Sequence, residues 1–406
     1  MVLPITFQCP WACVGARSLR WVSRRRDDGA PAIARVLRSA AVPLDETDSL
    51  ARHTAYLRTA HFPSLDGLRC LSIVPVVWHH ATSGPIDGIL GKGPVGVDLF
   101  FAISGFLITT RMLDERAATG TVALGPFYLR RSLRIFPLYY AVLALHVARA
   151  FFLLPDGPQR AHFFRSLPYW ATYTANWFVD FDVPHPVIFA FGWSLATEEQ
   201  FYAIWPLVVR TARGAAVPVV TALLLLLVDQ GIEHGLFLDL PPLARRMLAS
   251  IASPICMGAL LAYALRGSRS FAAMWTLLGH RVSAPLVLFA VMAMLHFDSV
   301  PLVAVQLGLV LLVGACTIRP DHGLRALTDA APVRFIGTVS YGIYLIHVSM
   351  ITLARGVLPS AWRSPVWVFL SAFALTLAVA AASHRWFEQP FVRLRHRFGR
   401  RQLNAA

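Results

Sequence analysis

The chain has 406 residues, 56% of them hydrophobic, and its mean hydropathy is +0.56. Apolar runs of near-spanning length recur along it, which excludes an ordinary soluble domain and indicates an all-α, multi-pass membrane helical bundle. In such a protein the formal charge of +15 matters through its distribution, because the loops rich in basic residues are those that face the cytoplasm. We therefore expect a lipid bilayer, and no nucleic acid, as a partner.

Residues 1–61 differ from the rest of the chain. They contain a basic run at 24–26 and scattered Pro and Gly, without a sustained hydrophobic period. Their apolar start precedes the basic run, which reverses the order found in a signal peptide. We expect a disordered cytoplasmic extension that the chemistry does not need, or a gene model that begins too early.

Ten spanning helices are predicted after this extension. Arginines concentrate in the alternate loops that share a side with the N-terminus, so the positive-inside rule places both termini in the cytoplasm. Residues 393–406 then form a basic cytoplasmic tail. The predicted spans are 64–82, 95–112, 135–154, 192–209, 215–232, 247–265, 282–297, 300–318, 335–354 and 365–384.

The first span carries two ionisable side chains, Arg69 in the sequence LDGLR and His80 near the other end. On an α-helix their spacing places both on one face, about 16 Å apart along the axis. Ionisable groups inside a membrane usually face a cavity or each other. The pair therefore predicts a polar path through the bundle, from which the adjacent His79 points away.

The second span begins with Asp98 and contains the pair Ser104-Gly105. In an antiparallel hairpin with the first span, Asp98 is expected close in depth to His80, where it could orient the imidazole as the third member of a triad does. The alternative is an interfacial acid solvated by headgroup water. Ser104 and Gly105 suit close helix packing, and also a close approach of the backbone to a ligand.

Three arginines, Arg130, Arg131 and Arg134, lead into the third span. Arg130 and Arg134 are one turn apart on one helical face, and forked guanidinium groups suit phosphate oxygens. Topogenic charge or lipid headgroup binding explains the same cluster. The residues alone leave both interpretations open.

The fourth span contains adjacent glutamates, Glu198 and Glu199, with Tyr202 one turn further on. Carboxylates inside a span are costly unless they face protein or water, so we expect a functional role for at least one of them. Because neighbouring residues on a helix diverge by about 100°, at most one aims squarely into a common cavity. A structural network is the alternative.

The ninth span carries Ser340, Tyr344 and His347 at helical spacing, which forms a single polar stripe. Such a stripe either lines the same cavity or hydrogen-bonds neighbouring helices. The cysteine spacing favours neither a disulfide framework nor a metal site, so no metal is expected.

Six motifs follow one another along residues 62–392. They are LDGLR with His80 at 65–80, GVDLFFAISGFLI at 96–108, RRSLRIFPLYY at 130–140, WSLATEEQFYAIWP at 193–206, SYGIYLIH at 340–347 and EQP at 388–390. Together and in this order they resemble the acyltransferase-3 family of bacterial integral membrane O-acyltransferases.

The resemblance implies a ten-span enzyme of the bacterial inner membrane. It implies transfer of an acyl group, expected to be acetyl, from cytoplasmic acyl-CoA to a hydroxyl of a carbohydrate, glycolipid, exopolysaccharide or macrolide. Acyl-CoA is then a co-substrate, and no cofactor is bound permanently. Some members carry a fused extracytoplasmic esterase-like domain; since this chain ends soon after Pro390, we expect it to act alone or with a separate extracytoplasmic partner.

The resemblance also suggests which side chains act. His80 is expected to be the general base, or in a variant mechanism the covalent carrier of the acyl group. Arg69 is expected to steer the CoA or polarise its carbonyl, and Asp98 or Glu198 to orient the imidazole. We assign the donor to Arg130, Arg131, Arg134, Ser104 and Gly105, and the other substrate contacts to Glu199, Tyr202, Ser340, Tyr344 and His347.

A transporter or flippase of a glycolipid or an anionic solute would use the same kind of intramembrane polar path. Transporters often show repeated halves and paired broken helices, and the sequence shows neither. Binding or hydrolysis of acyl-CoA by the purified protein distinguishes the two classes.

Overall fold

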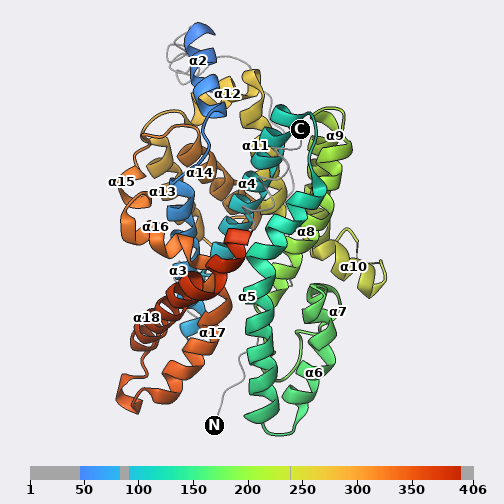
Figure 1. The fold of residues 1–406 in the computed structure, drawn as a ribbon, viewed down its shortest axis with the longest axis vertical. Coiled ribbons are helices and arrows are strands. Elements are labelled where there is room, and N and C mark those ends of the chain that lie inside the picture. The colour runs from blue at the N-terminus through green and yellow to red at the C-terminus, as the bar shows by residue number, and fades with distance from the viewer. Residues whose placement is uncertain (1–45, 83–90, 238, 395–406) are drawn as a thin grey trace, which may run out of the picture.

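The computed structural model describes residues 46–82, 91–237 and 239–394, and within these ranges all regular structure is helical (Figure 1). The α-helices are α2 (Glu46–Leu57), α3 (Ser64–Ala81), α4 (Val95–Thr119), α5 (Leu124–Phe152), α6 (Pro158–Ala171), α7 (Ala175–Phe178), α8 (Gly192–Thr211), α9 (Ala216–Glu233), α10 (Pro242–Ala249), α11 (Ser253–Arg266), α12 (Ser268–Leu278), α13 (Ser283–His296), α14 (Leu302–Thr317), α15 (Arg325–Thr328), α16 (Ala331–Thr338), α17 (Ser340–Val357) and α18 (Pro365–Ser383). A 3-10 turn, η2 (Ser360–Trp362), precedes α18, and a π turn, η3 (His384–Glu388), follows it.

A helix lies at each of the ten predicted spans. By length and composition, 4 of the described helices could cross a membrane, or up to 7 if each sharply bent pair forms one span. The 4 are α4, α5, α9 and the helix that continues from α18 to Leu394. The helical class and the apolar spans are therefore confirmed, while the number ten and the side of the termini stay predictions.

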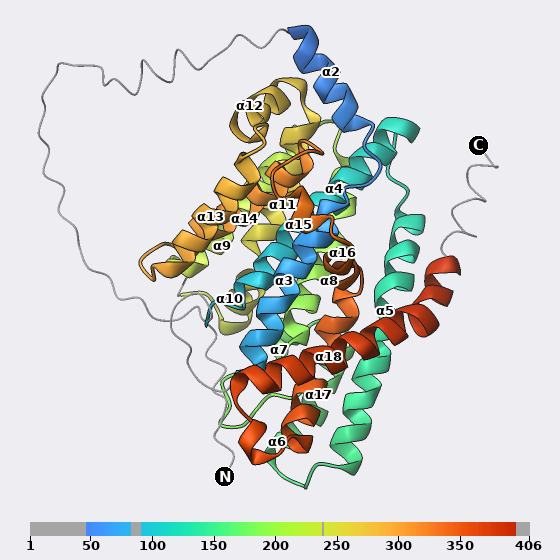
Figure 2. The same cartoon turned by 90° about the vertical axis from the view of Figure 1, so that its left-hand side faces the viewer.

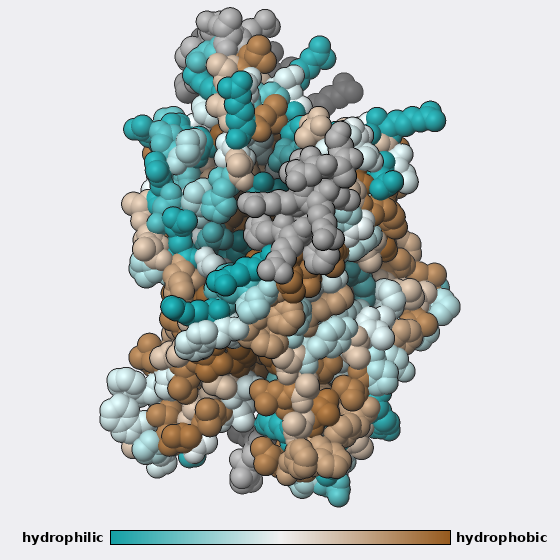
Figure 3. Space-filling model, viewed as in Figure 1, coloured by the Kyte–Doolittle hydropathy of each residue, from teal (hydrophilic) through white to brown (hydrophobic). Residues whose placement is uncertain are grey.

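The polar and apolar surfaces of the molecule are separated along its long axis. Hydrophilic residues gather over the end that carries α2 and α12, and hydrophobic residues cover much of the lower half (Figure 3). In the turned view α3 and α4 lie side by side within the bundle, and α18 runs obliquely past α17 (Figure 2). This distribution fits a bundle whose apolar flanks face lipid.

The hairpin of α3 and α4 is closed by glycines. A Cβ atom at Gly96 would lie 2.2 Å from the carbonyl oxygen of Ser72, and one at Gly93 would lie 2.4 Å from that of Pro75. The two helices therefore approach backbone to backbone and run antiparallel. This register determines which residues of α4 are level with which residues of α3.

Glycines also bring α16 against the start of α3. A Cβ at Gly337 would lie 1.7 Å from the carbonyl oxygen of Asp66, and one at Gly67 would lie 2.3 Å from that of Thr328. Directly after this contact the chain bends by 74° from α16 into α17. The LDGLR motif is thus locked against the segment that begins the polar stripe of the ninth span.

Part of the N-terminal extension is ordered. Residues 46–57, expected within a disordered segment, form α2, whose side chains His53 and Tyr56 are buried. His53 Nε2 donates to the carbonyl oxygen of Arg266 at the end of α11 (3.1 Å), and both buried rings contact Phe271 of α12, with centroids 4.8 and 5.4 Å away. Aromatic burial at a three-residue spacing explains why this helix stays on the bundle.

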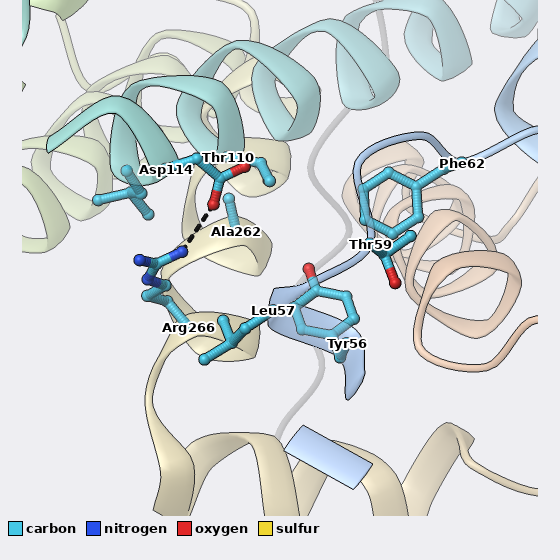
Figure 4. A pocket seen from close by; sticks show the side chains of 9 residues that line it. Tyr56, Leu57, Thr59, Phe62, Thr110, Asp114, Ala262 and Arg266 are labelled. Atoms are coloured by element: carbon cyan, nitrogen blue, oxygen red, sulfur yellow. Dashed lines mark hydrogen bonds and ion pairs between the residues drawn. The ribbon is translucent and has the colours of Figure 1, made fainter. Parts of the chain in front are cut away.

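A small pocket lies where α2 meets α4 and α11 (Figure 4). The Arg266 guanidinium pairs with Asp114 of α4 at 2.7 Å on one side of it, and Tyr56 and Phe62 line the other. Arg111 of α4 also donates to the carbonyl oxygen of Ala60, in the segment between α2 and α3 (2.6 Å). The connection from α2 to α3 is therefore attached to the bundle.

We predict that two N-terminal truncations differ in stability. Removal of residues 1–45, which keeps α2, should leave the unfolding midpoint in detergent unchanged, as expected for a segment without a sustained hydrophobic period. Removal of residues 1–59 should lower it, because Phe271 loses two aromatic neighbours and the end of α11 loses its imidazole donor. Equal midpoints for the two truncated proteins, measured by thermal unfolding, would show that α2 adds nothing to stability.

We also predict that Gly337→Ala destabilises the protein by about 1–3 kcal/mol, the usual cost of overpacking. Gly356→Ala is the matched control: it is also helical, but a Cβ there meets nothing within 4 Å. Alanine normally improves a helix by about 0.5–1 kcal/mol over glycine, so the control should be neutral or stabilised. Thermal unfolding of both variants tests this, and a stable Gly337→Ala protein would contradict the backbone contact.

Candidate active site

A cavity of about 100 Å³ lies between α3, α4, α5, α8 and α17. Most of the ionisable and hydroxyl groups that the sequence marks as unusual for a membrane line it, together with an apolar wall. The lining residues are Arg69, Ser104, Arg131, Arg134, Ser194, Glu198, Ser340, Tyr341 and Tyr344, and the apolar Val97, Phe100, Phe101, Ile135 and Leu195. Five distant motifs therefore meet at one place, as expected for a functional site inside a bundle.

Glu198 is the centre of one wall. Its Oε1 accepts a hydrogen bond from Ser104 of α4 at 2.5 Å and another from the hydroxyl of Tyr202, one turn along α8. Arg131 of α5 pairs with the same oxygen at 3.2 Å, and its guanidinium lies over the Tyr202 ring, 3.7 Å from the centroid. The four side chains form one network that joins α4, α5 and α8.

Glu199 lies on the other side of Arg131. Its Oε1 is 4.0 Å from Arg131 Nε, and neither atom has a hydrogen-bond partner among the described residues. As the helical geometry requires, only one of the two glutamates lines the cavity, and it is Glu198. Arg131 thus lies between two carboxylates, so its positive charge is balanced within the protein and is less available to bind a ligand.

Arg69 and Arg134 also present guanidinium groups to the cavity. Arg69 Nη1 donates to Asp66 Oδ1 at 2.7 Å, so the aspartate of LDGLR fixes its orientation from one turn earlier. Arg130, by contrast, pairs with Glu115 of α4 at 3.4 Å. The three arginines predicted as one phosphate-binding cluster therefore have three different environments.

The polar stripe of α17 continues away from the cavity. Ser340 and Tyr344 line the cavity, and the Tyr344 hydroxyl shares a hydrogen bond of 2.5 Å with Ser194 and donates to the carbonyl oxygen of Phe191 at 3.0 Å. The next member, His347, is fully buried, and its ring centroid is 5.7 Å from that of Tyr344. The stripe therefore leads from the cavity to a buried imidazole.

His80 lies next to His347, at the end of the series of side chains that runs from the cavity through Tyr344. Its ring meets the ring of His347 edge to face, with centroids 4.8 Å apart. His80 Nδ1 donates to the carbonyl oxygen of Val76 at 2.9 Å, and Arg355 of α17 donates to the carbonyl oxygens of His80 and Ala81 at 3.3 and 3.0 Å. Arg69 and His80 thus mark two ends of a polar path that passes through Tyr344 and His347.

Asp98 lies elsewhere. The contact of Gly96 with Ser72 places the following turn of α4 away from the end of α3 that carries His80, which corrects the expected closeness in depth. Asp98 instead accepts a hydrogen bond from Gln306 of α14 at 3.4 Å. The expected position of Asp98 was wrong because it depends on the register of the hairpin, which the hydropathy of the sequence does not report.

Gly105 serves helix packing. A Cβ there would lie 2.0 Å from the carbonyl oxygen of Ile255, and one at Gly258 would lie 2.2 Å from that of Ala102, so α4 and α11 touch through two glycines. Its neighbour Ser104 reaches the cavity from the same turn. The packing role therefore belongs to Gly105, and a ligand contact at Ser104 stays a prediction.

Several residues of this region are not among those predicted from the sequence. Asp66, Ser194 and Tyr341 were not singled out, although Ser194 lies one turn before Glu198 and the same periodicity could have found it. Arg355 gave no signal, because an arginine at the end of a span usually faces the interface. Within the described ranges no three His, Cys, Asp or Glu side chains are grouped as metal ligands.

Curated proteins of similar sequence are O-acetyltransferases or putative ones. The peptidoglycan O-acetyltransferase OatA of Listeria monocytogenes is 29% identical over 372 residues, which is 84% of this chain and 57% of the relative. The putative peptidoglycan O-acetyltransferase YrhL of Bacillus subtilis is 26% identical, over 82% of this chain and 56% of the relative. A putative O-acetyltransferase of Staphylococcus aureus, SACOL0978, is 25% identical, over 83% and 58%.

The chain thus spans less than three fifths of the length of these relatives. No solved structure matches it. The family model described as an acyltransferase domain matches residues 62–385, which includes every residue that lines the cavity and both histidines at its end. The chain therefore belongs to the acyltransferase-3 family.

Proposed function

We propose that the protein is a membrane-embedded O-acyltransferase that moves an acetyl group from acyl-CoA to a hydroxyl of a carbohydrate. The observation that carries this proposal is the polar path itself. An arginine-lined cavity reaches Tyr344, and ring contacts continue from Tyr344 through His347 to the half-buried imidazole of His80. Such a path suits an anionic donor at one end and a base at the other.

The donor end is assigned to Arg134 and Arg69. Both guanidinium groups line the cavity, and coenzyme A carries phosphates that such groups bind well. A volume of about 100 Å³ is too small for a whole coenzyme A, so its phosphates would meet these two arginines from the cytoplasmic side with the adenosine outside the cavity, and the thioester would extend toward His80. Arg130 suits a peripheral contact with the same phosphates, and Arg131 suits a supporting role.

The base is assigned to His80. Because Nδ1 donates to the Val76 carbonyl, the neutral ring carries its lone pair on Nε2. Nε2 takes the proton of the acceptor hydroxyl while the hydroxyl oxygen forms a bond to the acyl carbon. The bond from that carbon to sulfur then breaks, and the thiolate of coenzyme A leaves and takes up a proton.

Arg131, Glu198, Ser104 and Tyr202 are proposed to preorganise the cavity. Their mutual hydrogen bonds fix a serine hydroxyl and a guanidinium at its wall before the substrate arrives. Glu198 therefore acts on Arg131 and Ser104, and Asp98, beside Gln306, has no assigned part in the transfer.

The acceptor is proposed to be a glycan hydroxyl on the outer side of a bacterial inner membrane. The names of the relatives above favour a peptidoglycan-type carbohydrate over a macrolide. Since the chain covers only part of those relatives, the complete reaction of the longer proteins is not assumed for it.

The first test uses His80→Ala and His79→Ala in the purified protein. A general base contributes about 10²–10⁴ in rate, so His80→Ala should lower acetyl transfer from radiolabelled acetyl-CoA to a soluble glycan by that factor. His79→Ala should retain substantial activity, because the ring of His79 contacts His80 but is neither part of the cavity lining nor the ring that meets His347. Both variants should insert and elute as the wild type does.

Loss of transfer in His79→Ala together with normal transfer in His80→Ala would overturn the assignment of the base. A wild-type protein that neither binds nor cleaves acetyl-CoA would overturn the proposed function as a whole.

The second test concerns the donor. Arg134→Gln should raise the KM for acetyl-CoA about ten- to a hundredfold, since a charged hydrogen bond contributes about 1.5–3 kcal/mol. The KM for the glycan should change less. Arg213→Gln is the control, because Arg213 is exposed in the loop between α8 and α9 and tests a general effect of surface charge. Equal changes in the two variants would return Arg134 to a topogenic role.

A further inference from the structure

His80 and His347 are held in the same way. Each ring uses Nδ1 to donate to a backbone carbonyl of its own helix, at Val76 (2.9 Å) and at Tyr344 (2.6 Å). This fixes the same tautomer in both neutral rings, with a proton on Nδ1 and a lone pair on Nε2. The two rings then meet edge to face at 4.8 Å.

The Nε2 atom of His347 has no hydrogen-bond partner among the described residues, and its side chain is fully buried. A buried polar atom without a partner usually marks a functional requirement or a small molecule that completes it. The other rings that contact His347 belong to Phe191 and Tyr344, so His80 is the neighbouring ring that can accept or supply a proton at an imidazole nitrogen.

We propose that His80 and His347 act as one pair that stores a single proton between their Nε2 atoms during acyl transfer. This rests on the function proposed above, and it changes the role of His347 from a substrate contact to a proton acceptor. Because His347 Nε2 makes no direct hydrogen bond to His80, the proton passes between the two nitrogens through one water molecule, which is within the usual reach of acid–base groups.

The proton balance of the step is simple. His80 Nε2 takes the proton of the acceptor hydroxyl as the oxygen–carbon bond forms, and one proton is then shared by the pair. When the carbon–sulfur bond breaks, the sulfur keeps the electron pair of that bond. The stored proton passes to that sulfur, so coenzyme A leaves as the thiol, and both imidazoles return to their neutral form with Nδ1 protonated.

The surrounding charges favour one proton, not two, on the pair. On α3 the ring of His79 contacts His80, with centroids 5.4 Å apart, and on α17 Arg355 binds the backbone of His80. On α5 His146 faces the same Phe191 ring as His347 does, and on α8 Glu198 is the acid that lines the cavity. A second proton would add another positive charge close to Arg355, which like-charge repulsion disfavours.

The test measures how fast diethylpyrocarbonate modifies His80 as a function of pH, by peptide mass spectrometry of the whole protein in detergent. The reagent attacks the unprotonated ring, so its rate follows the titration of His80. In the wild type we expect a coupled titration in two steps, and in His347→Asn a single step.

His146→Asn is the matched control. His146 is buried and donates from Nδ1 to the carbonyl oxygen of Val142 at 2.9 Å, but its Nε2 faces Ser349 at 3.5 Å. The control variant removes a similar imidazole from a similar environment, so it should leave the His80 titration as in the wild type. A His80 titration that His347→Asn does not alter would overturn the proposal.

Acetyl transfer by the same proteins provides the second readout. His347→Asn should lower kcat about ten- to a hundredfold, less than loss of the base itself, with an unchanged KM for acetyl-CoA. A lowered kcat with an unaltered titration would mean that His347 acts only in packing, against the proposal. If the wild type shows coupled titration but no transfer from acetyl-CoA, the proposed function fails while the histidine pair stands.

Discussion

The cost of holding a guanidinium away from water organises this molecule. Arg131 lies between Glu198 and Glu199, and an unpaired charge in that position would cost several kcal/mol. Pairing it requires α5 and α8 to approach, and Ser104, which hydrogen-bonds to Glu198, connects α4 to the same network. The cavity is therefore the space left beside a necessary ion-pair network, already equipped with polar groups on one wall.

The second requirement is a break in a helix. α16 packs its glycine on the start of α3, and the 74° bend that follows turns α17 so that its polar stripe begins at the cavity and ends at His80. A straight helix could not both lie against the LDGLR motif and deliver three polar residues along this path. The bend thus connects the arginine end of α3 to its histidine end through a second helix.

The sequence predicted the helices and marked Arg69, Arg134, Glu198 and Tyr344 as candidates for a polar site, because apolar runs and intramembrane charges each have few stable arrangements. It did not predict which partner each charge would take. Arg131 pairs with carboxylates of another helix, and Asp98 accepts a hydrogen bond from Gln306. These partners depend on the register of neighbouring helices, which is set by glycine contacts that hydropathy does not describe. The helix α2 was missed because its stability comes from two aromatic contacts with α12 and not from its own period.

The contact between Gly337 and the backbone of Asp66 has a consequence for which substitutions this chain can accept. An interface made of side chains can drift, because a larger residue on one helix is compensated by a smaller one on the other. Here one partner is a carbonyl oxygen and the other a hydrogen atom, so no compensating substitution exists. Arg69 lies one turn from this contact. Its orientation is therefore protected from gradual change, because no pair of substitutions at this interface can compensate each other.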